Sequence, residues 1–165
     1  MALVQLGGNP VTTNGQLPAT GSPAPGFTLI KNDLSEISLK EFQGTRLVMN
    51  IFPSIDTSTC ATSVRKFNQQ ASALQNTKIL CISRDLPFAQ KRFCGAEGIE
   101  NVLTLSDFRD GKFGKDYGIE MLAGKLKGLH ARAVVVTDEN GIVIYSELVQ
   151  NISDEPNYAA ALAVL

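Results

Sequence analysis

Apolar, strand-like runs alternate with helix-forming segments along most of this chain, and this alternation limits the possible folds more than any other feature. The runs LVMNIF (47–52) and KILCIS (78–83) are expected to form central strands. Between them, residues 58–75 carry apolar side chains at helical spacing. Strand, helix, strand, helix and a final hairpin predict an α/β sandwich with a mixed central β-sheet flanked by helices.

Similar patterns predict the remaining elements. We expect strands at 27–31 and 101–106, short helices at 39–44, 86–95 and 112–118, a closing helix after 153, and an N-terminal β-hairpin within about residues 1–15. Gly95 is expected to end its helix, and the Asn-Gly pair at 140–141 favours a type I′ turn in the last hairpin. Ser153 or Asp154 is expected to cap the closing helix.

Size and composition narrow the possible functions. The chain has 165 residues, of which 44% are hydrophobic and 19% charged, and this predicts one folded domain over residues 1–165. The formal net charge of -1 indicates no nucleic acid and no anionic membrane as partner. The apolar runs are too short to cross a bilayer and no secretory signal is recognised, so we expect a cytoplasmic protein.

Cys60 has the most informative position of the three cysteines, whose odd number argues against a structural disulfide framework. It stands in the first turn of its expected helix, where free backbone N–H groups and the helix dipole favour thiolate over thiol. Thr57, one turn earlier, can bring its hydroxyl beside the sulfur, and Pro53 can shield it from water. The alternative is a small apolar residue at the start of a core stripe. We expect the sulfur to be partly exposed.

Pro53, Thr57 and Cys60 match the P-x-x-x-(T/S)-x-x-C signature of the peroxiredoxin family. The wider stretch NIFPSIDTSTCATSVRKFN closely resembles the bacterial thiol peroxidase branch, as do CISRDLPFAQKRFCGAEG and KGLHARAVVVTDENG. Three blocks in order, within a resemblance over nearly the whole chain, are more specific than one signature. The resemblance implies a thioredoxin-like fold and the thiol-dependent reduction of hydrogen peroxide and of alkyl and lipid hydroperoxides.

The resemblance also implies roles for residues and partners. Cys60 would be the peroxidatic and Cys94 the resolving cysteine of an intrachain disulfide that thioredoxin reduces. Because both cysteines are expected on helices, we expect disulfide formation to require local unwinding. Arg132 would lie beside Cys60; the alternative is an edge arginine paired with a surface carboxylate. The resemblance further implies a homodimer and no metal, haem or flavin.

Cys94 and Cys81 occupy different kinds of position. Cys94 ends a helix whose expected apolar face is formed by Leu86, Ala89 and Phe93, so it should lie away from the deepest core. By spacing alone, it could equally be a merely accessible thiol. Cys81 lies within an apolar strand and is expected to be an inert core residue.

Two alternative functions would also involve the cysteines. A thioredoxin-type disulfide oxidoreductase needs C-x-x-C, but Thr57 and Ser63 stand three residues before and after Cys60. A structural zinc module could use three thiols and the single histidine, His130, although the spacing contains no short ligand pair. His130 is expected at the surface, on the same strand face as Arg132. The zinc ligands would be Cys60, Cys81, Cys94 and His130.

Overall fold

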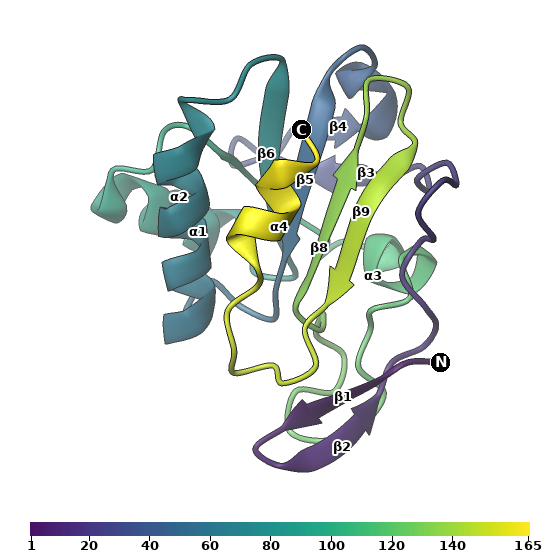
Figure 1. The fold of residues 1–165 in the computed structure, drawn as a ribbon. Coiled ribbons are helices and arrows are strands. Elements are labelled where there is room, and N and C mark those ends of the chain that lie inside the picture. The colour runs from purple at the N-terminus through teal and green to yellow at the C-terminus, as the bar shows by residue number, and fades with distance from the viewer.

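Two parallel strands, β5 (Arg46–Ile51) and β6 (Thr77–Ser83), form the centre of the structure, and the helix α1 (Ser58–Ala71) connects them. The computed structural model describes residues 1–165. Both strands are almost entirely buried because they lie inside a seven-stranded sheet. The strand order is β4-β3-β7-β6-β5-β8-β9, with β7, β6 and β5 parallel and the other neighbours antiparallel (Figure 1).

The other elements are short. The remaining strands of the sheet are β3 (Thr28–Ile30), β4 (Glu36–Ser38), β7 (Leu103–Ser106), β8 (Ala133–Thr137) and β9 (Val143–Leu148). The remaining helices are the 3-10 helix η1 (Leu39–Phe42), α2 (Pro87–Glu97), α3 (Lys112–Asp116) and α4 (Tyr158–Ala163). None of them combines the length and the apolar character that a membrane span requires.

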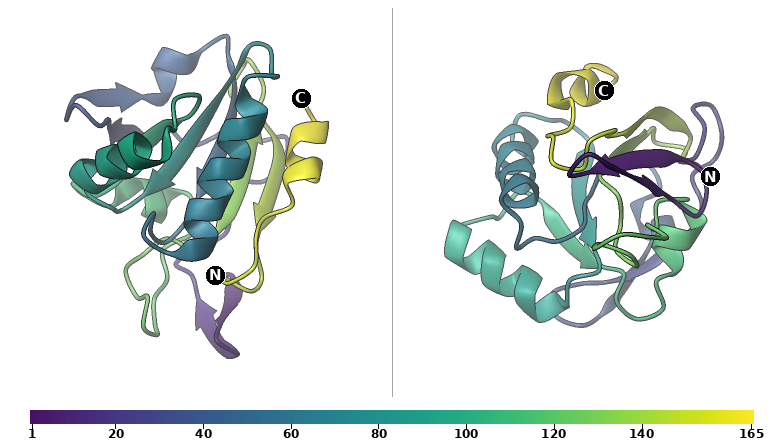
Figure 2. Two further views of the ribbon diagram at one scale, coloured as in Figure 1. Left: turned by 90° about the vertical axis from the view of Figure 1, so that its left-hand side faces the viewer. Right: turned by 90° about the horizontal axis from the view of Figure 1, so that it is seen from below.

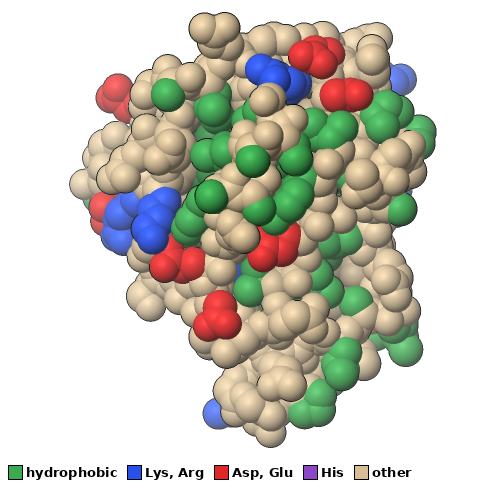
Figure 3. Space-filling view, viewed as in Figure 1, with side chains coloured by type: hydrophobic (Ala, Val, Ile, Leu, Met, Phe, Trp, Pro, Cys, Tyr) green, Lys and Arg blue, Asp and Glu red, His purple; other side chains and the backbone are tan.

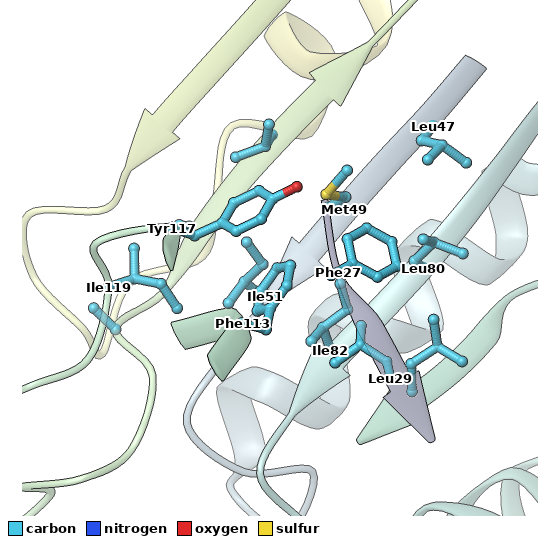
Figure 4. Close-up of a cluster of buried hydrophobic side chains, with 14 of the residues drawn as sticks. Phe27, Leu29, Leu47, Met49, Ile51, Leu80, Ile82, Phe113, Tyr117 and Ile119 are labelled. Carbon is cyan, nitrogen blue, oxygen red and sulfur yellow. The ribbon is translucent and has the colours of Figure 1, made fainter. Parts of the chain in front are cut away.

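Different parts of the chain cover the two faces of the sheet. Along β6, Cys81 points to one face and Leu80 to the other, as strand geometry requires. The helices α1, α2 and α4 cover the Cys81 face (Figure 2). On the opposite face, the ring of Phe113 stacks on Tyr117 and contacts Phe27 edge-on, above the central strands (Figure 4). The sheet therefore has a hydrophobic core on each side.

The short helix α4 closes the Cys81 face beside α1. Its buried Ala161 lies in the core, and the ring of Tyr158 meets Phe67 of α1 edge-on, with 5.0 Å between ring centroids. Figure 3 shows hydrophobic side chains around α4, and Leu162 and Leu165 of this segment pack against the core below it. The C-terminal segment is thus held by apolar contacts.

The predicted N-terminal hairpin is confirmed. Strands β1 (Leu3–Leu6) and β2 (Asn9–Thr12) pair antiparallel around Gly7 and Gly8, which both have positive φ. The hairpin docks on the segment after β9, because the N–H of Gln5 donates to Gln150 and the N–H of Ile152 donates to Gln5. A mixed sheet flanked by helices, with this hairpin, is the predicted arrangement.

Three local predictions are wrong, and one strand was not predicted. The helix α2 continues through Gly95, and Gly98, with φ of 65°, caps it instead, because Gly98 takes the left-handed conformation. At the last hairpin only Gly141 has positive φ, so the turn is not type I′, and the Asp138 carboxylate accepts the N–H groups of the turn. Asn157 caps α4, since its side chain accepts the N–H of Ala160. The strand β4 was not expected.

Candidate active site

The side chain of Cys60 lies at the carboxyl end of the central strands, in the first turn of α1. It is fully buried, not partly exposed as expected, because α1 presses this turn onto the sheet. The helix start is anchored below by β5: Asn50 donates to the Ser63 hydroxyl, which donates to the Cys60 carbonyl. Asn50 is the one polar residue in the run LVMNIF, and this role was not predicted.

Arg132 lies beside Cys60, although 72 residues separate them in the chain. Its Nη2 donates to the Cys60 Sγ at 3.2 Å, and its Nε donates to the carbonyl of Ile152 at 2.9 Å. The guanidinium is buried, and its Nη1 has no hydrogen-bond partner. The predicted neighbourhood of thiol and arginine is therefore present, and the surface-carboxylate alternative for Arg132 is wrong.

The N-terminal hairpin supports this arginine. Gln5 in β1 hydrogen-bonds through its backbone to Gln150 and Ile152, and the carbonyl of Ile152 is the acceptor for Arg132 Nε. A hydrogen bond to a charged donor holds its acceptor more firmly than a neutral one does. Chain segments from both termini thus meet behind the guanidinium.

Pro53 and Thr57 frame the loop before α1. Pro53 is buried, and Thr57 is the N-cap residue of α1. The Thr57 hydroxyl does not bond the Cys60 sulfur: it donates to the carbonyl of Ser54 at 3.1 Å. The structure therefore brings Cys60 and Arg132 into contact, while Pro53 and the exposed Thr57 lie in the loop before α1.

Asp85 holds the loop before α1, and this residue was not predicted from the sequence. It follows β6, and its carboxylate accepts the hydroxyl of Ser54 and the N–H of Ile55, both at 2.7 Å. The hydroxyl of Ser83 donates to the same carboxylate at 2.6 Å. A carboxylate directly after a buried strand, in the block CISRD, was the available signal, since strand ends gather at one edge of the sheet.

Cys94 lies on α2, apart from Cys60. Its thiol is half-buried and stands 3.6 Å from the Thr104 hydroxyl of β7, and all three cysteines are free thiols. The partner of Cys94 lies on β7, whereas Arg132, the partner of Cys60, directly precedes β8. Two strands lie between β7 and β8, so these two strands are roughly 14 Å apart. The structure therefore does not bring the predicted pair into bonding distance.

The inward face of α2 differs from the predicted one. Leu86 is exposed, whereas Gln90 is fully buried and donates to the Leu105 carbonyl and to the Ser83 hydroxyl. Buried polar groups are tolerated when they are hydrogen-bonded, and an apolar pattern does not detect them. Cys94, one turn after Gln90, shares this inward face but stays outside the deepest core, as expected.

Cys81 is the inert core thiol that its strand predicts. It is fully buried, and the side chain of Asn50 approaches its sulfur at 3.7 Å. Burial raises the pKa of the Cys81 thiol to about 12. This thiol is therefore protonated at neutral pH.

The prediction that His130 lies at the surface, on the face of Arg132, is wrong. Its side chain is fully buried, and its Nε2 lies 2.9 Å from Oδ2 of Asp107 on the other side of the sheet, near Phe113. Residues 130–132 precede β8 and do not follow regular strand alternation, which explains the error. Burial lowers the pKa of His130, and the Asp107 carboxylate only partly offsets this.

The zinc hypothesis does not fit this geometry. Its four residues have separate partners, and no group of three or more His, Cys, Asp or Glu side chains could hold a metal ion. The partners are Arg132 for Cys60, Asn50 for Cys81, Thr104 for Cys94 and Asp107 for His130.

Comparison with known proteins gives consistent results. A family model described as Redoxin matches residues 19–162. Thiol peroxidases of Corynebacterium glutamicum and Mycobacterium bovis are 56% and 57% identical over 165 residues, covering 100% of this chain and 99% of each relative. The crystal structure of a peroxiredoxin-like protein from Aquifex aeolicus is 39% identical, with a TM-score of 0.93 over 99% of this chain and 96% of that one. The predicted thioredoxin-like fold is confirmed.

Proposed function

The chain belongs to the redoxin family as a thiol peroxidase of the peroxiredoxin group, and on that premise we propose that Cys60 is the residue that attacks the hydroperoxide. The observation that carries this proposal is the 3.2 Å contact between Arg132 Nη2 and the Cys60 Sγ. A guanidinium at this distance stabilises a thiolate, the nucleophilic form of cysteine. The unpartnered Nη1 is a further donor for a peroxide oxygen.

In the first step, the Cys60 thiolate attacks the terminal oxygen of the hydroperoxide. The new S–O bond forms as the O–O bond breaks, and the leaving oxygen takes a proton and departs as water or an alcohol. Cys60 is oxidised to a sulfenic acid and the peroxide is reduced. Arg132 orients the oxygens, Pro53 limits access of water, and Thr57 holds the loop through Ser54.

In the second step, Cys94 resolves the sulfenic acid. Its sulfur attacks the Cys60 sulfur, the S–S bond forms, and the S–O oxygen leaves as water. Cys94 contacts Thr104 on β7, and Cys60 contacts Arg132 just before β8, and these strands are roughly 14 Å apart. Therefore α1, α2 or both must unwind locally before the S–S bond can form. The half-buried position of Cys94 near the end of α2 favours such a movement.

A dithiol protein then restores the two thiols, and we propose thioredoxin for this role, as the family resemblance implies. One of its thiolates attacks the disulfide and forms a mixed disulfide, and its second thiol releases the reduced peroxidase. Two electrons and two protons pass to Cys60 and Cys94 in this exchange. Thioredoxin leaves as its own disulfide.

We also propose a homodimer that uses the apolar surface beside the Cys60 loop, the segment 53–57 that precedes α1. Leu86, Phe88 and Phe108 are 51%, 65% and 38% exposed, and a group of exposed apolar side chains is typical of a protein–protein contact. Leu86 directly follows Asp85, which binds the Cys60 loop, so this surface borders the site. Sedimentation of the Phe88→Glu variant is expected to give a monomer where the unaltered protein gives a dimer.

Peptide mass spectrometry of the thiols tests the proposed chemistry directly. After one equivalent of hydrogen peroxide, we expect a Cys60–Cys94 disulfide, which disappears on addition of reduced thioredoxin. Cys81 is expected to stay an unmodified thiol, because it is buried and protonated. A Cys60 that remains a free thiol while peroxide is consumed would contradict the proposal.

Two variants distinguish the proposed roles of Cys60 and Cys94. Cys60→Ser is expected to abolish peroxide consumption. Cys94→Ser is expected to consume one equivalent and then stop with Cys60 as a sulfenic acid, which dimedone labels. Cys81→Ser is the matched control, since the same substitution in the core leaves both proposed roles intact.

A further inference from the structure

Asp85 stands between the two segments that carry the proposed redox cysteines. On one side, its two carboxylate oxygens accept the Ser54 hydroxyl and the Ile55 N–H of the Cys60 loop, which comprises residues 53–57. Ser54 is the key residue there, because its carbonyl accepts both the N–H and the hydroxyl of Thr57. The carbonyl of Thr57 in turn accepts the N–H of Ala61, a hydrogen bond of the first turn of α1. The carboxylate thus supports the start of α1 through the loop.

On the other side, Asp85 is linked to α2. It precedes Leu86, the N-cap residue of α2, and its own carbonyl accepts the Ser106 hydroxyl. The Ser83 hydroxyl donates to the carboxylate and accepts from Gln90, which lies one turn before Cys94. A continuous hydrogen-bond chain therefore runs from α2 through Ser83 and Asp85 to the Cys60 loop.

Such a chain couples the two segments energetically. Hydrogen bonds to a charged group are stronger than neutral ones, and a half-buried carboxylate that loses some partners is costly to leave in place. When the Cys60 loop opens, Asp85 loses two of the donors that fix its position, so its carboxylate is free to turn away from Ser83, the residue that holds Gln90. The reverse holds when α2 opens. Opening of one segment therefore lowers the free energy needed to open the other.

We propose that Asp85 is a positioning residue that holds the Cys60 loop and the start of α2 in one closed arrangement, and that both segments open together when the disulfide forms. This inference rests on the proposed roles of Cys60 and Cys94. Asp85 favours the closed arrangement in which Arg132 contacts the sulfur, and so promotes attack on peroxide. It opposes the open arrangement, and so delays resolution.

The substitution Asp85→Asn tests this inference, because an amide presents a donor where the loop N–H or a hydroxyl donates now. In single-turnover stopped flow of the full chain, we expect oxidation of Cys60 to slow roughly 10-fold and disulfide formation to accelerate roughly 10-fold. Faster resolution leaves the sulfenic acid exposed to peroxide for less time. The fraction of Cys60 converted to sulfinic acid per turnover should fall in proportion.

The matched control is Asp138→Asn. Asp138 also accepts two backbone N–H groups, from Asn140 and Ile142, but it lies in the turn after β8, away from the Cys60 end of that strand. It should change neither rate constant. Gln90→Met removes the α2 end of the hydrogen-bond chain with little change in side-chain volume. It should accelerate disulfide formation while leaving the rate of Cys60 oxidation within about 2-fold.

The outcomes are distinguishable. Opposite changes in the two rate constants, absent in Asp138→Asn and non-additive in the double variant Asp85→Asn/Gln90→Met, support the inference. Equal slowing of both steps, or no change relative to Asp138→Asn, would overturn it while the proposed function stands. If the unaltered protein forms no Cys60–Cys94 disulfide, the proposed function fails first. Thermal unfolding of each variant checks that it is folded.

Discussion

Arg132 places a positive charge inside the protein, where its only side-chain partner is the Cys60 sulfur. A buried cation is costly unless an anion or strong acceptors compensate it. Ile152 supplies a carbonyl acceptor, and a Cys60 thiolate would supply the anion. In the proposed reaction, the thiolate and the guanidinium compensate each other's charge, so each residue depends on the other.

Replacement of Arg132 should therefore slow the peroxide step. Arg132→Met removes a charge-assisted hydrogen bond, so we expect the second-order rate constant of Cys60 oxidation to fall roughly 10- to 100-fold. Arg132→Lys should recover only part of this loss, because an ammonium lacks the planar fork of donors. Stopped-flow oxidation by hydrogen peroxide measures both values. A wild-type rate in Arg132→Met would contradict the proposed role.

The lowered pKa of the buried His130 should make the free energy of unfolding depend on pH. Burial holds the pKa of His130 below its ordinary value of 6.5, so the unfolded chain takes up a proton below about pH 6.5 that the folded protein excludes. The free energy of unfolding should therefore fall as the pH decreases from 7 to 5, by at most about 1.4 kcal/mol per pH unit. Urea unfolding at several pH values measures this slope.

The control is His130→Gln. His130 is the only histidine in the chain, so the variant should show a much flatter dependence between pH 7 and 5, whatever its absolute stability. Equal slopes in the two proteins would show that other groups cause the dependence. Below this range the Asp107 carboxyl adds a second loss: burial would raise its pKa, but the contact with His130 and two backbone N–H groups keep it lowered.

At the scale of elements, the helices are held by specific end contacts as well as by their apolar faces. The capping hydrogen bond of α4, from the Ala160 N–H to the Asn157 side chain, satisfies a group that would otherwise lack a partner. Between α1 and α2, Arg65 and Glu97 form a two-pronged ion pair, but both side chains are well exposed. Exposed ion pairs contribute little to the free energy of unfolding, so we expect the cap of α4 to contribute more than this pair.

The cap of α4 gives a testable stability change. Asn157→Ala should lower the free energy of unfolding by about 1 kcal/mol, whereas Asn157→Asp, which keeps an acceptor oxygen, should preserve most of it. Urea unfolding followed by circular dichroism measures the difference. Equal losses in the two variants would mean that the side-chain acceptor is unimportant.

At the scale of the whole molecule, the sheet is the rigid part and its carboxyl edge carries the parts expected to move. The strands β5, β6 and β8 are buried and hydrogen-bonded on both sides. The Cys60 loop and α2 are fixed to this edge by side-chain contacts that can break one at a time. Local opening is therefore expected at the edge while the sheet stays intact.

Hydrogen exchange can compare the two redox states. In the disulfide form, amides of the first turn of α1 and of α2 should exchange faster than in the dithiol form, because these segments must unwind to join the two sulfurs. Amides of the three central strands should be unchanged. Equal protection of α1 and α2 in both states would contradict the requirement for unwinding.

Local patterns were enough to predict many elements. The apolar runs of β5 and β6, the start of α1 at Ser58, and the hairpin around Gly7 and Gly8 depend on neighbouring residues, and these predictions agree with the structure. Predictions at element ends were weaker. Gly95 and Gly98 are both competent stops, and only the backbone conformation of Gly98 decides between them.

What the sequence determined by itself is therefore the alternation of strands and helices and the placement of a thiol at a helix start, because hydrophobic period and capping act over a few residues. Tertiary structure decided which distant groups meet. The order β6-β5-β8 brings Arg132 to Cys60, the end of β6 puts Asp85 under the Cys60 loop, and the chain before β8 turns His130 into the core. These contacts depend on how strands are ordered in the sheet, and no local pattern encodes that order.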